Sequence, residues 1–324
     1  MSINEKLIRI FHESVEEYIS GAELARKLGV SRTTVWNHIH YLMQQGYKFD
    51  ASTNLGYRLL SIPDRMLPDE ITCGLGTKWL AREILSYEEV DSTNDLAMRL
   101  AADGAKAGTV IFSEHQRKGR GRLHRRWYSS RRKDLLLSII LRPVFHPRYV
   151  TQLTITSALA TAQAVREMYR LPALIKWPND IIINEKKCGG ILIEMGAELD
   201  SIKHVVVGIG INVNSREADF PKSFRSRATS LSIELGTKCD RIAFTKQLLR
   251  QFEKHYDRLI SEGFNGIRRE WEDLSLSLGR RVEARSEDET ITGMAVRLDD
   301  DGGLLVRTDT GIVRKKFGGD LTVY

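Results

Sequence analysis

The sequence predicts an α+β protein of several domains: a winged helix-turn-helix, a mixed α/β domain and a small all-β domain. Three observations favour this division. The chain has 324 residues, which is long for one hydrophobic core. Capped helices and a short hairpin occupy residues 1–62, helical and strand patterns alternate over 66–274, and short alternating strands with tight turns fill 278–324. Pro63 and Pro68 bracket the expected linker between the first two domains.

The first domain carries the signals of a helix-turn-helix. Ser20 stands three residues before a glutamate, which is the spacing of a capping box, and Gly29 supplies the turn after a short helix. Ser31 then caps a second helix, whose apolar side is formed by Val35, Ile39 and Leu42. Residues 47–59, interrupted at 52–56, predict a two-stranded wing.

The second helix has a polar face suited to the major groove of DNA. Short hydrogen-bonding side chains and an arginine near the helix start are typical of base-edge and phosphate contacts. The candidate DNA contacts are Arg32, Thr33, Thr34, Asn37 and His40. An ordinary solvent-facing helix is the alternative, because residues 1–64 carry seven basic and seven acidic side chains. A domain this neutral predicts weak DNA binding by a monomer, which makes dimerisation a natural control point.

The later domains are expected from periodicity. Apolar runs at 135–141 and 205–209 predict buried strands. Amphipathic patterns at 151–169 and 241–260 predict helices packed on a sheet. Beyond Gly279 the short strands and tight turns predict a small SH3-like β-barrel.

The most basic segment surrounds Gly119-Arg120-Gly121-Arg122. From Glu114 to Lys133 there are nine basic residues and one acidic residue, so this segment carries +8 while the whole chain carries +7. The glycines permit close backbone approach to a ligand. We expect the loop to bind an anion and to be mobile until that anion arrives. A solvated charged loop or a nucleic-acid contact is the alternative that charge alone allows.

Several classes are excluded by the sequence. It has neither a signal peptide's basic start and apolar core nor an apolar run near ~18 residues, so we expect a cytoplasmic protein with no membrane partner. Cys73, Cys188 and Cys239 are odd in number and widely spaced, which argues against a disulfide framework or a zinc site. No Gly-x-Ser-x-Gly elbow or Cys/His constellation is present. The sequence thus predicts no protein-held metal and no enzymatic nucleophile.

Five motifs follow one another along the chain. They are Asp-Ser-Thr-Asn at 91–94, Gly-Arg-Gly-Arg at 119–122, Lys-Trp-Pro-Asn-Asp at 176–180, Lys-Cys-Gly-Gly-Ile-Leu-Ile-Glu at 187–194 and Gly-Ile-Gly-Ile-Asn-Val-Asn at 208–214. In this order they resemble the catalytic domain of biotin-protein ligases. With the helix-turn-helix ahead of them, the whole chain resembles the bifunctional biotin-protein ligase and biotin operon repressor family. The resemblance implies a central ligase domain related to class II synthetase-like folds and an SH3-like C-terminal domain.

The resemblance also implies an activity. The chain would be a biotin-[acetyl-CoA-carboxylase] ligase that uses ATP to make biotinyl-5'-adenylate and transfers biotin to the biotin carboxyl carrier protein. Biotin would also be the corepressor, with operator DNA as partner and a homodimer when the adenylate is bound. Joining a carboxylic acid to an amine needs a leaving group such as AMP. Preorganised Arg and Lys, with Mg²⁺ on the nucleotide, stabilise the phosphoryl charge that this reaction develops.

Site residues follow from the same resemblance. Lys187 would hold the carboxyl oxygen and the α-phosphate, with Arg122 in the phosphate and carboxylate loop. Lys176 would support the phosphate, and Asp180 would position or deprotonate the acceptor lysine. The implied biotin-binding residues are Ser92, Thr93, Asn94, Gln116, Arg120, Gly121, Arg122, Lys187, Gly190 and Gly208. Those implied for ATP and the adenylate are Gly119, Arg120, Arg122, Trp127, Lys176, Asn179, Lys187 and Asn212.

Alternatives remain open at single residues and for the whole chain. Lys187 could be a surface lysine, residues 91–93 only a helix N-cap, and Trp177-Pro178 only a packing corner. A tryptophan such as Trp127 is also common at a strand edge without a ligand. The alternative functions are a biotin-sensing regulator without efficient ligase activity and a lipoate-type acyltransferase. Arg120 and Arg122, followed by a tryptophan, favour biotin over lipoate.

One position departs from the family pattern Gly-Arg-Gly-Arg-x-Gly-Arg-x-Trp. His124 stands where the third glycine is expected. Histidine lacks the freedom of glycine to adopt a positive φ, and its ring can titrate near neutral pH. The departure bears on loop closure and on retention of the intermediate, and not on the type of reaction.

Overall fold

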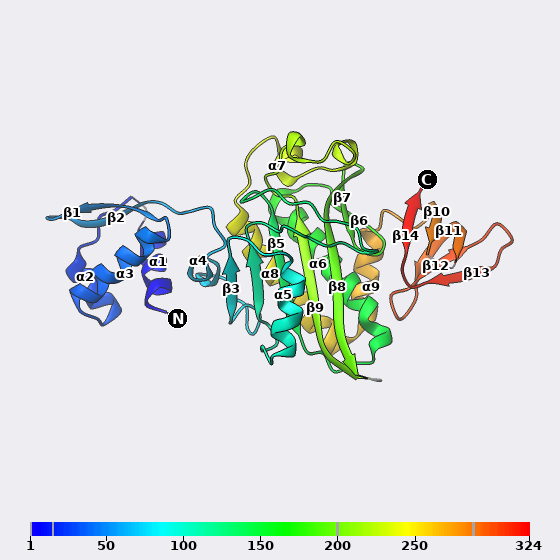
Figure 1. Ribbon diagram of the computed structural model, residues 1–324, viewed down its shortest axis with the longest axis horizontal. Coiled ribbons are helices and arrows are strands. Elements are labelled where there is room, and N and C mark those ends of the chain that lie inside the picture. The colour runs from blue at the N-terminus through cyan, green and yellow to red at the C-terminus, as the bar shows by residue number, and fades with distance from the viewer. Residues whose placement is uncertain (1, 15, 199–200, 287–288) are drawn as a thin grey trace. The chain divides into compact units, whose positions relative to one another are not determined.

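The computed structural model describes residues 2–14, 16–198, 201–286 and 289–324. It divides into two compact units, Met1–Gly76 and Thr77–Tyr324. The three predicted kinds of domain are confirmed: a helix-turn-helix, a domain with a mixed sheet and an all-antiparallel C-terminal domain (Figure 1).

The first unit is a helix-turn-helix with a wing. Its elements are α1 (Ile3–Glu13), α2 (Gly21–Leu28), α3 (Arg32–Gln44), β1 (Lys48–Ser52), β2 (Gly56–Ser61) and α4 (Pro68–Thr72). Ser20 and Ser31 cap α2 and α3 by accepting backbone N–H groups at 3.1 and 3.0 Å. Gly29 ends α2 with a φ of 68°, a left-handed conformation that glycine adopts without strain. The predicted apolar face of α3 is buried in the core of this unit.

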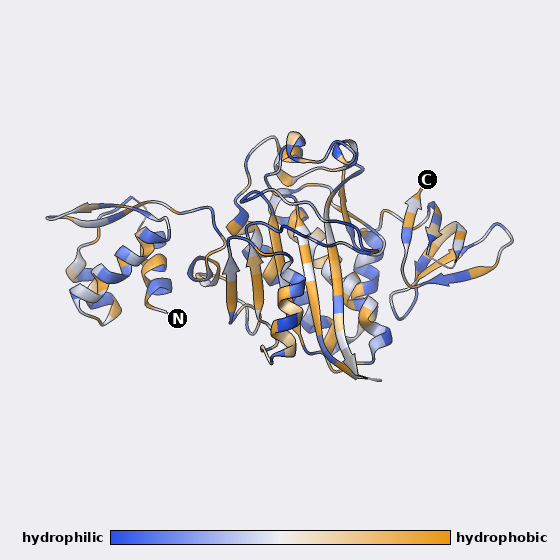
Figure 2. Ribbon diagram, viewed as in Figure 1, coloured by the Kyte–Doolittle hydropathy of each residue, from blue (hydrophilic) through white to orange (hydrophobic). Residues whose placement is uncertain are grey.

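The second unit is built on a seven-stranded sheet in the order β3-β4-β5-β9-β8-β7-β6. The strands are β3 (Ile84–Tyr87), β4 (Val110–Ser113), β5 (Leu135–Leu141), β6 (Leu174–Lys176), β7 (Asp180–Ile183), β8 (Lys186–Glu198) and β9 (Ser201–Ile211). Among the described strands of this sheet, only β3 and β4 pair in parallel. The predicted strand at 135–141 is confirmed and is buried along its whole length, and Figure 2 colours it as hydrophobic.

Helices cover both faces of this sheet (Figure 1). One face carries α5 (Thr93–Ala102), and α6 (Val150–Tyr169), α8 (Arg241–Glu262) and α9 (Phe264–Asp273) form a layer on the other. The remaining short elements are α7 (Leu231–Leu235) and the 3-10 helices η1 (Pro147–Tyr149), η2 (Glu217–Asp219) and η3 (Arg225–Arg227). The amphipathic helices predicted at 151–169 and 241–260 are therefore confirmed. Among the described helices, none has the length and apolar character needed to cross a bilayer.

The C-terminal domain is a five-stranded antiparallel sheet in the order β13-β12-β11-β10-β14. Its strands are β10 (Arg281–Arg285), β11 (Thr290–Leu298), β12 (Leu304–Arg307), β13 (Val313–Lys316) and β14 (Asp320–Val323). It is attached to the rest of the second unit by specific contacts. The Leu298 N–H donates to Glu272 of α9 at 3.0 Å, and Arg268 of α9 pairs with Asp300 at 2.7 Å.

Candidate functional site

The candidate site lies on the face of the central sheet that α5 covers, where the strand register aligns residues in rows. Directly opposed residues of an antiparallel pair point to the same face. One row, here called the first row, consists of Ser138, Gly208 and Leu192. The second row consists of Leu136, Gly210, Gly190, Asp180 and Lys176. The rows are two residues apart along each strand, or about 7 Å.

Asn94 is fixed over the first row. Its Oδ1 accepts from Ser138 Oγ at 2.6 Å, while its Nδ2 donates to the Leu192 carbonyl at 3.2 Å and to Glu194 Oε2 at 2.8 Å. A Cβ on Gly208 would lie 2.1 Å from Asn94 Oδ1. Gly208 is therefore required for Asn94 to occupy this place. Both Nδ2 hydrogens of Asn94 are used inside the protein, whereas Oδ1 keeps acceptor capacity for a ligand.

The start of α5 gathers other predicted biotin-binding residues around Asn94. Ser92 is the N-cap and accepts from the Asp95 N–H at 3.4 Å. The N–H and Oγ1 of Thr93 lie 2.7 and 3.1 Å from Gln116 Oε1. Because Thr93 occupies Oε1, the Nε2 group of Gln116 is the part of this side chain that can donate a hydrogen bond to a ligand. Ser92 therefore caps α5 and also lies beside Asn94.

Lys187 reaches the second row because β8 contains a bulge. Ile181 pairs with Gly189 and Ile182 with Lys187, so β8 has one more residue than β7 between these pairs. A bulge re-aims neighbouring side chains. Lys187 Nζ consequently lies 2.5 Å from Asp180 Oδ1. The Lys187 side chain is half-exposed and is held by this ion pair.

The second row also gathers cations without carboxylate partners. Arg122 Nη1 donates to Asn179 Oδ1 at 3.0 Å. In the described part of the chain, neither Arg122 nor Lys176 forms an ion pair. Burial lowers the pKa of Lys176, with Asp180 acting in the opposite direction and Lys187 in the same one. Burial likewise lowers the pKa of Arg122. Partly desolvated cations of this kind favour an incoming anion.

The Lys-Trp-Pro-Asn-Asp motif forms the turn of the β6–β7 hairpin. Lys176 on β6 lies opposite Asp180 on β7 in the strand register. The Trp177–Pro178 peptide is cis. Trp177 is 2% exposed, and its indole Nε1 donates to the Gly302 carbonyl of the C-terminal domain at 3.2 Å. Trp177 is thus a packing residue, and the C-terminal domain anchors the turn that carries Lys176 and Asp180.

Trp127 lies on the second row. A Cβ on Gly210 would lie 2.7 Å from the indole ring, and one on Gly190 would lie 3.4 Å from it. Lys187 Nζ is 5.9 Å from the ring centroid. The indole Nε1 is buried and has no hydrogen-bond partner, which leaves a donor suited to a ligand.

The basic loop folds as a small hairpin over these rows. Arg120 and Arg126 form a bridge, the Gly121 N–H donates to the Arg125 carbonyl at 2.7 Å, and the Trp127 N–H donates to the Gly119 carbonyl at 2.9 Å. At the tip, His124 has a φ of 56°. This is the left-handed region that glycine favours, so the histidine occupies it with strain that the expected glycine would not have. That the loop becomes ordered on ligand binding stays a prediction.

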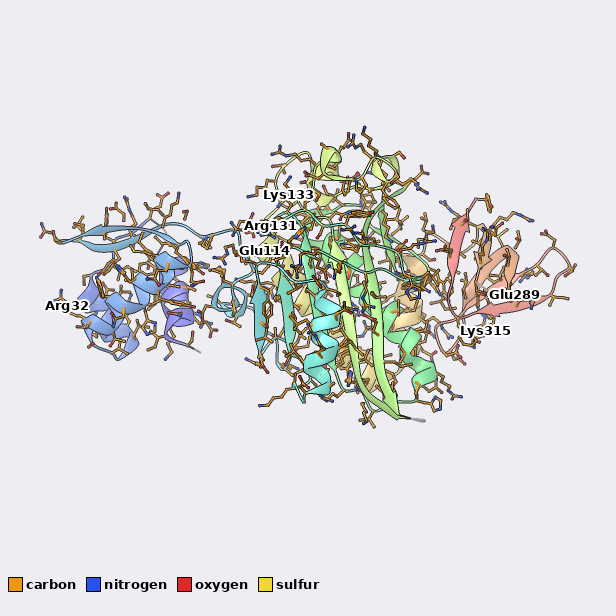
Figure 3. The ribbon with its side chains drawn as sticks, in the orientation of Figure 1. Arg32, Glu114, Arg131, Lys133, Glu289 and Lys315 are labelled. Carbon is orange, nitrogen blue, oxygen red and sulfur yellow. The ribbon has the colours of Figure 1, made fainter. Side chains whose placement is uncertain are left out.

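Most of the loop's charge is neutralised by carboxylates of the protein itself. The pairs are Arg117 and Lys118 with Asp91, Arg131 with Glu89, Arg132 with Glu88, Lys133 with Asp219, Arg125 with Asp320, and Arg120 with Glu194. Figure 3 labels Arg131, Lys133 and Glu114. Most basic residues of the loop therefore have a carboxylate partner without any external anion, and these partners are distant in sequence.

A buried ionic cluster anchors both ends of the loop. Arg241 Nη1 lies 2.8 Å from Glu114 Oε2 and 3.0 Å from the Asp134 carbonyl. Asp134 accepts from the Ser130 and Val213 N–H groups at 2.8 and 3.2 Å. Burial raises the pKa of Asp134 to about 6, against these hydrogen bonds. The cluster fixes where the loop leaves and rejoins the sheet.

Asn212 takes a different position from the other predicted residues. It is buried, its N–H donates to the Cys188 carbonyl at 2.9 Å, and its Nδ2 donates to the Thr229 carbonyl at 2.9 Å. In this structure it ties the 212–231 loop to the sheet. Sequence reasoning missed Ser138, Glu194 and Gly210, which support Asn94 or Trp127. Ser138 did give a signal, since it is the one polar residue in the apolar run 135–141.

The polar face of α3 is solvent-accessible in the first unit. Arg32, Thr33, Asn37 and His40 are exposed, whereas Thr34 is partly buried and its N–H donates to the Ser31 cap. Sequence reasoning missed Trp36, which is 50% exposed and stacks on His40 with ring centroids 4.4 Å apart. Figure 3 labels Arg32 on this helix.

No cluster of three or more His, Cys, Asp or Glu side chains suited to a metal occurs among the described residues. Cys73, Cys188 and Cys239 are all buried, and none of the three forms a disulfide within the described ranges. Apart from Asp180, the polar residues around the second row are cations and amides, which fit phosphate groups.

Comparison with known proteins matches each part of the chain. The biotin/lipoate A/B protein ligase family matches residues 87–212, an HTH domain matches 4–58, and the biotin protein ligase C-terminal domain matches 277–319. The biotin protein ligase from Aquifex aeolicus, solved in complex with biotin and ATP, is 31% identical with a TM-score of 0.64. That match covers 75% of this chain and 99% of the Aquifex chain.

Other relatives match over nearly the whole chain. The bifunctional ligase/repressor BirA of Bacillus subtilis (strain 168) is 39% identical over 99% of this chain and 98% of its own length. The protein of the same name from Escherichia coli (strain K12) is 27% identical over 95% of this chain and 93% of its own length. With the helix-turn-helix, the mixed-sheet domain and the C-terminal domain all matched in order, the chain belongs to the bifunctional biotin ligase/repressor family.

Proposed function

We propose that this chain attaches biotin to the biotin carboxyl carrier protein of acetyl-CoA carboxylase, using ATP, and represses biotin-synthesis genes when its adenylate is bound. The observation that carries the ligase half is the second row, where Arg122, Lys176 and Lys187 surround Asp180. Arg122 and Lys176 have no carboxylate partner of their own in the described ranges. A desolvated group of cations suits a carboxylate and a triphosphate brought together.

The reaction would proceed in two displacements. First, a carboxylate oxygen of biotin attacks the α-phosphorus of ATP, and the bond to pyrophosphate breaks. Arg122, Lys176 and Lys187 would stabilise the charge on the phosphoryl oxygens. Mg²⁺ would enter with the nucleotide and neutralise its phosphates. The carrier lysine amine then attacks the acyl carbon of the adenylate, AMP leaves, and the amine loses its proton with Asp180 positioned to help.

Binding roles would divide between the two rows. Ser92, Thr93, Asn94 and Gln116, around the first row, would hydrogen-bond the ureido ring of biotin. The carboxyl end would then extend towards Gly190 and Lys187, with Gly121 and Gly208 giving backbone room. Trp127, Asn179, Gly119 and Asn212 would line the nucleotide side. Arg120 is not grouped with these residues, because its partners differ from those of Arg122.

The repressor half rests on the first unit. The domains at 1–62, 66–274 and 278–324 would divide the work into DNA reading, ligation and support of the catalytic turn. Arg32, Thr33, Thr34, Asn37 and His40 would face operator DNA. A homodimer formed by the adenylate-bound protein would place two reading helices on one operator, which strengthens binding by linking two weak contacts.

The direct test is ATP-dependent transfer of biotin to a purified carrier domain, with pyrophosphate exchange as the assay of the first step. Lys187→Ala should slow exchange by about a hundredfold to a thousandfold, since one preorganised donor is worth ~2.7 to 4 kcal/mol. Lys186→Ala, in the adjacent position of the same turn, is the matched control and should exchange at the parent rate. Wild-type exchange in a folded Lys187→Ala protein would exclude the assignment. Transfer of lipoate in place of biotin would favour the acyltransferase alternative.

A further inference from the structure

Arg120 has partners that set it apart from Arg122. Its Nη2 lies 2.7 and 2.8 Å from the two carboxylate oxygens of Glu194, and it also pairs with Asp95. Asp95 stands in the first turn of α5, and Glu194 lies on β8 opposite Val206. This places Arg120 at the Asn94 end of the site. Arg122 instead reaches Asn179, beside the second row.

The local charge argues against anion binding by Arg120. One guanidinium faces two carboxylates, so the cluster of Arg120, Asp95 and Glu194 carries a net negative charge. A ligand carboxylate or phosphate would have to displace or approach these acids, which is unfavourable. Arg122 has no such partner in the described ranges and keeps its charge for a ligand.

Glu194 also joins the loop to Asn94. Its Oε2 accepts from Asn94 Nδ2 at 2.8 Å and from Arg120 Nη2 at 2.8 Å. The side chain of Glu194 is 25% exposed and that of Arg120 is 42% exposed. A single surface ion pair is worth little, but a shared carboxylate that also fixes a buried amide restricts several groups together.

We propose that Arg120, Glu194 and Asp95 form a latch that holds the hairpin of residues 117–127 closed over the Asn94 end of the site. Arg120 is then a positioning residue rather than a ligand for the carboxylate or phosphate. This inference rests on the proposed function. It assigns retention of biotin to the latch, and it assigns the phosphate chemistry to Arg122, Lys176 and Lys187. Opening the hairpin breaks the Arg120 pairs and frees one oxygen of Glu194, while Asn94 keeps Ser138 and Leu192.

The test uses the full chain with biotin and ATP. Glu194→Gln retains an oxygen for Asn94 but removes the charge that holds Arg120, and Asp95→Asn removes the second partner. Each should raise KM for biotin roughly fivefold, as expected for loss of one favourable ion pair. Neither should change KM for ATP or the kcat of pyrophosphate exchange more than about twofold, because the second row is untouched. Glu88→Gln, which removes the partner of Arg132 in the same loop, is the matched control and should change neither KM.

A double-mutant cycle separates a latch from two independent effects. In an Arg120→Ala background, adding Glu194→Gln should raise KM for biotin no further, because both substitutions break the same pair. Arg120→Lys should recover part of the loss. If Arg120→Ala instead lowers kcat of pyrophosphate exchange as much as Arg122→Ala does, and Glu194→Gln leaves KM for biotin unchanged, Arg120 binds the anion directly and the latch is wrong.

Amide hydrogen exchange tests the latch without any activity. In the ligand-free chain, residues 117–127 should exchange faster in Glu194→Gln and Asp95→Asn than in the parent or in Glu88→Gln. Equal exchange in all four proteins would overturn the proposal. If the parent protein shows no biotin-dependent pyrophosphate exchange, the proposed function is wrong. The amide exchange comparison still tests the latch in that case, because it needs no activity. Asp95→Asn, on the surface of α5, gives the answer even if Glu194→Gln folds poorly.

Discussion

At the scale of the residue, the two glycines of the Gly-Ile-Gly motif on β9 have identifiable tasks. A Cβ on Gly208 would lie 2.1 Å from Asn94 Oδ1, and one on Gly210 would lie 2.7 Å from the Trp127 ring. Neither glycine has a positive φ, so conformation does not require them. They provide space for two side chains of the site, one over each row.

This separation predicts different effects for two similar substitutions. Gly208→Ala should displace Asn94 and raise KM for biotin about tenfold or more, because the reacting geometry tolerates little displacement. Gly210→Ala should displace Trp127 and act mainly on KM for ATP. Steady-state kinetics with each substrate varied, in proteins whose circular dichroism matches the parent, would measure both effects. Equal effects of both substitutions on both substrates would contradict the assignment of one glycine to each row.

Sequence reasoning reached the candidate residues of the site but not their partners. The second-row residues Lys176, Asp180 and Lys187 were named through a resemblance, since none of their motifs is specific alone. Arg120 was grouped with Arg122 because both match the phosphate and carboxylate loop of the family that the sequence resembles. Their partners, Glu194 and Asn179, come from β8 and from the β6–β7 turn, and a count of charges along the chain cannot see such contacts.

At the scale of the element, local signals predicted helices well and missed the features that arise from pairing. Capping serines and apolar periodicity act within a few residues, so α2, α3, α6 and α8 were expected close to their observed bounds. The bulge that turns Lys187 towards Asp180 depends on how β7 and β8 pair. A register of this kind is set by tertiary packing and is not encoded in a single strand's pattern.

The helical layer contains a group that makes stability depend on pH. His255 of α8 is fully buried, and its Nε2 lies 2.7 Å from Gln163 Oε1 of α6. Burial lowers the pKa of His255 to about 4 from its usual 6.5, with Glu270 opposing and Arg258 assisting the shift. The neutral ring is thus favoured in the folded state. Its contribution is complete above about pH 6.5 and is lost as the pH falls towards 4.

We expect acidification from pH 7 to about 4 to reduce the free energy of unfolding by about 3 kcal/mol through this residue. His255→Leu should remove that part of the pH dependence, although the cavity and lost hydrogen bond lower stability at every pH. Urea denaturation at a series of pH values, compared between parent and variant, measures the difference. His146→Gln, at an exposed position, is the control and should keep the parent's pH profile. A His255→Leu profile parallel to that of the parent would contradict the shift.

At the scale of the whole molecule, the order of domains could be predicted because each has its own composition and period. The compact units meet at Gly76 and Thr77, beyond the predicted linker, because α4 belongs with the first unit. Asp69 of α4 accepts from Ser2 and Asn4 at 2.8 and 3.0 Å, and Asn4 contacts His38 of α3 at 2.7 Å. The two contacts of Asp69 span more than 60 residues of sequence, so no local pattern predicted them.

Removing the first unit should therefore separate the two proposed activities. We expect residues 77–324 to retain biotin transfer, since the two rows, the loop and the C-terminal domain all lie in that unit. The full chain should bind operator DNA more tightly with biotin and ATP than without them. Residues 1–64 are electrically neutral, so one copy of the first unit gains little DNA-binding affinity from contacts to phosphates. A ligand-induced dimer should strengthen DNA binding about a hundredfold, because the second contact becomes intramolecular.

The measurement is a titration of a candidate operator upstream of biotin-synthesis genes, at one fixed salt concentration, with and without biotin and ATP. Arg32→Ala should weaken binding in both conditions and leave biotin transfer unchanged, because Arg32 is exposed on α3 and lies in the unit that holds neither row. Sedimentation of the same samples should show that tighter binding accompanies a dimer. Identical titration curves with and without ligand would exclude ligand-controlled repression while leaving the ligase proposal intact, since the two activities depend on different units of the chain.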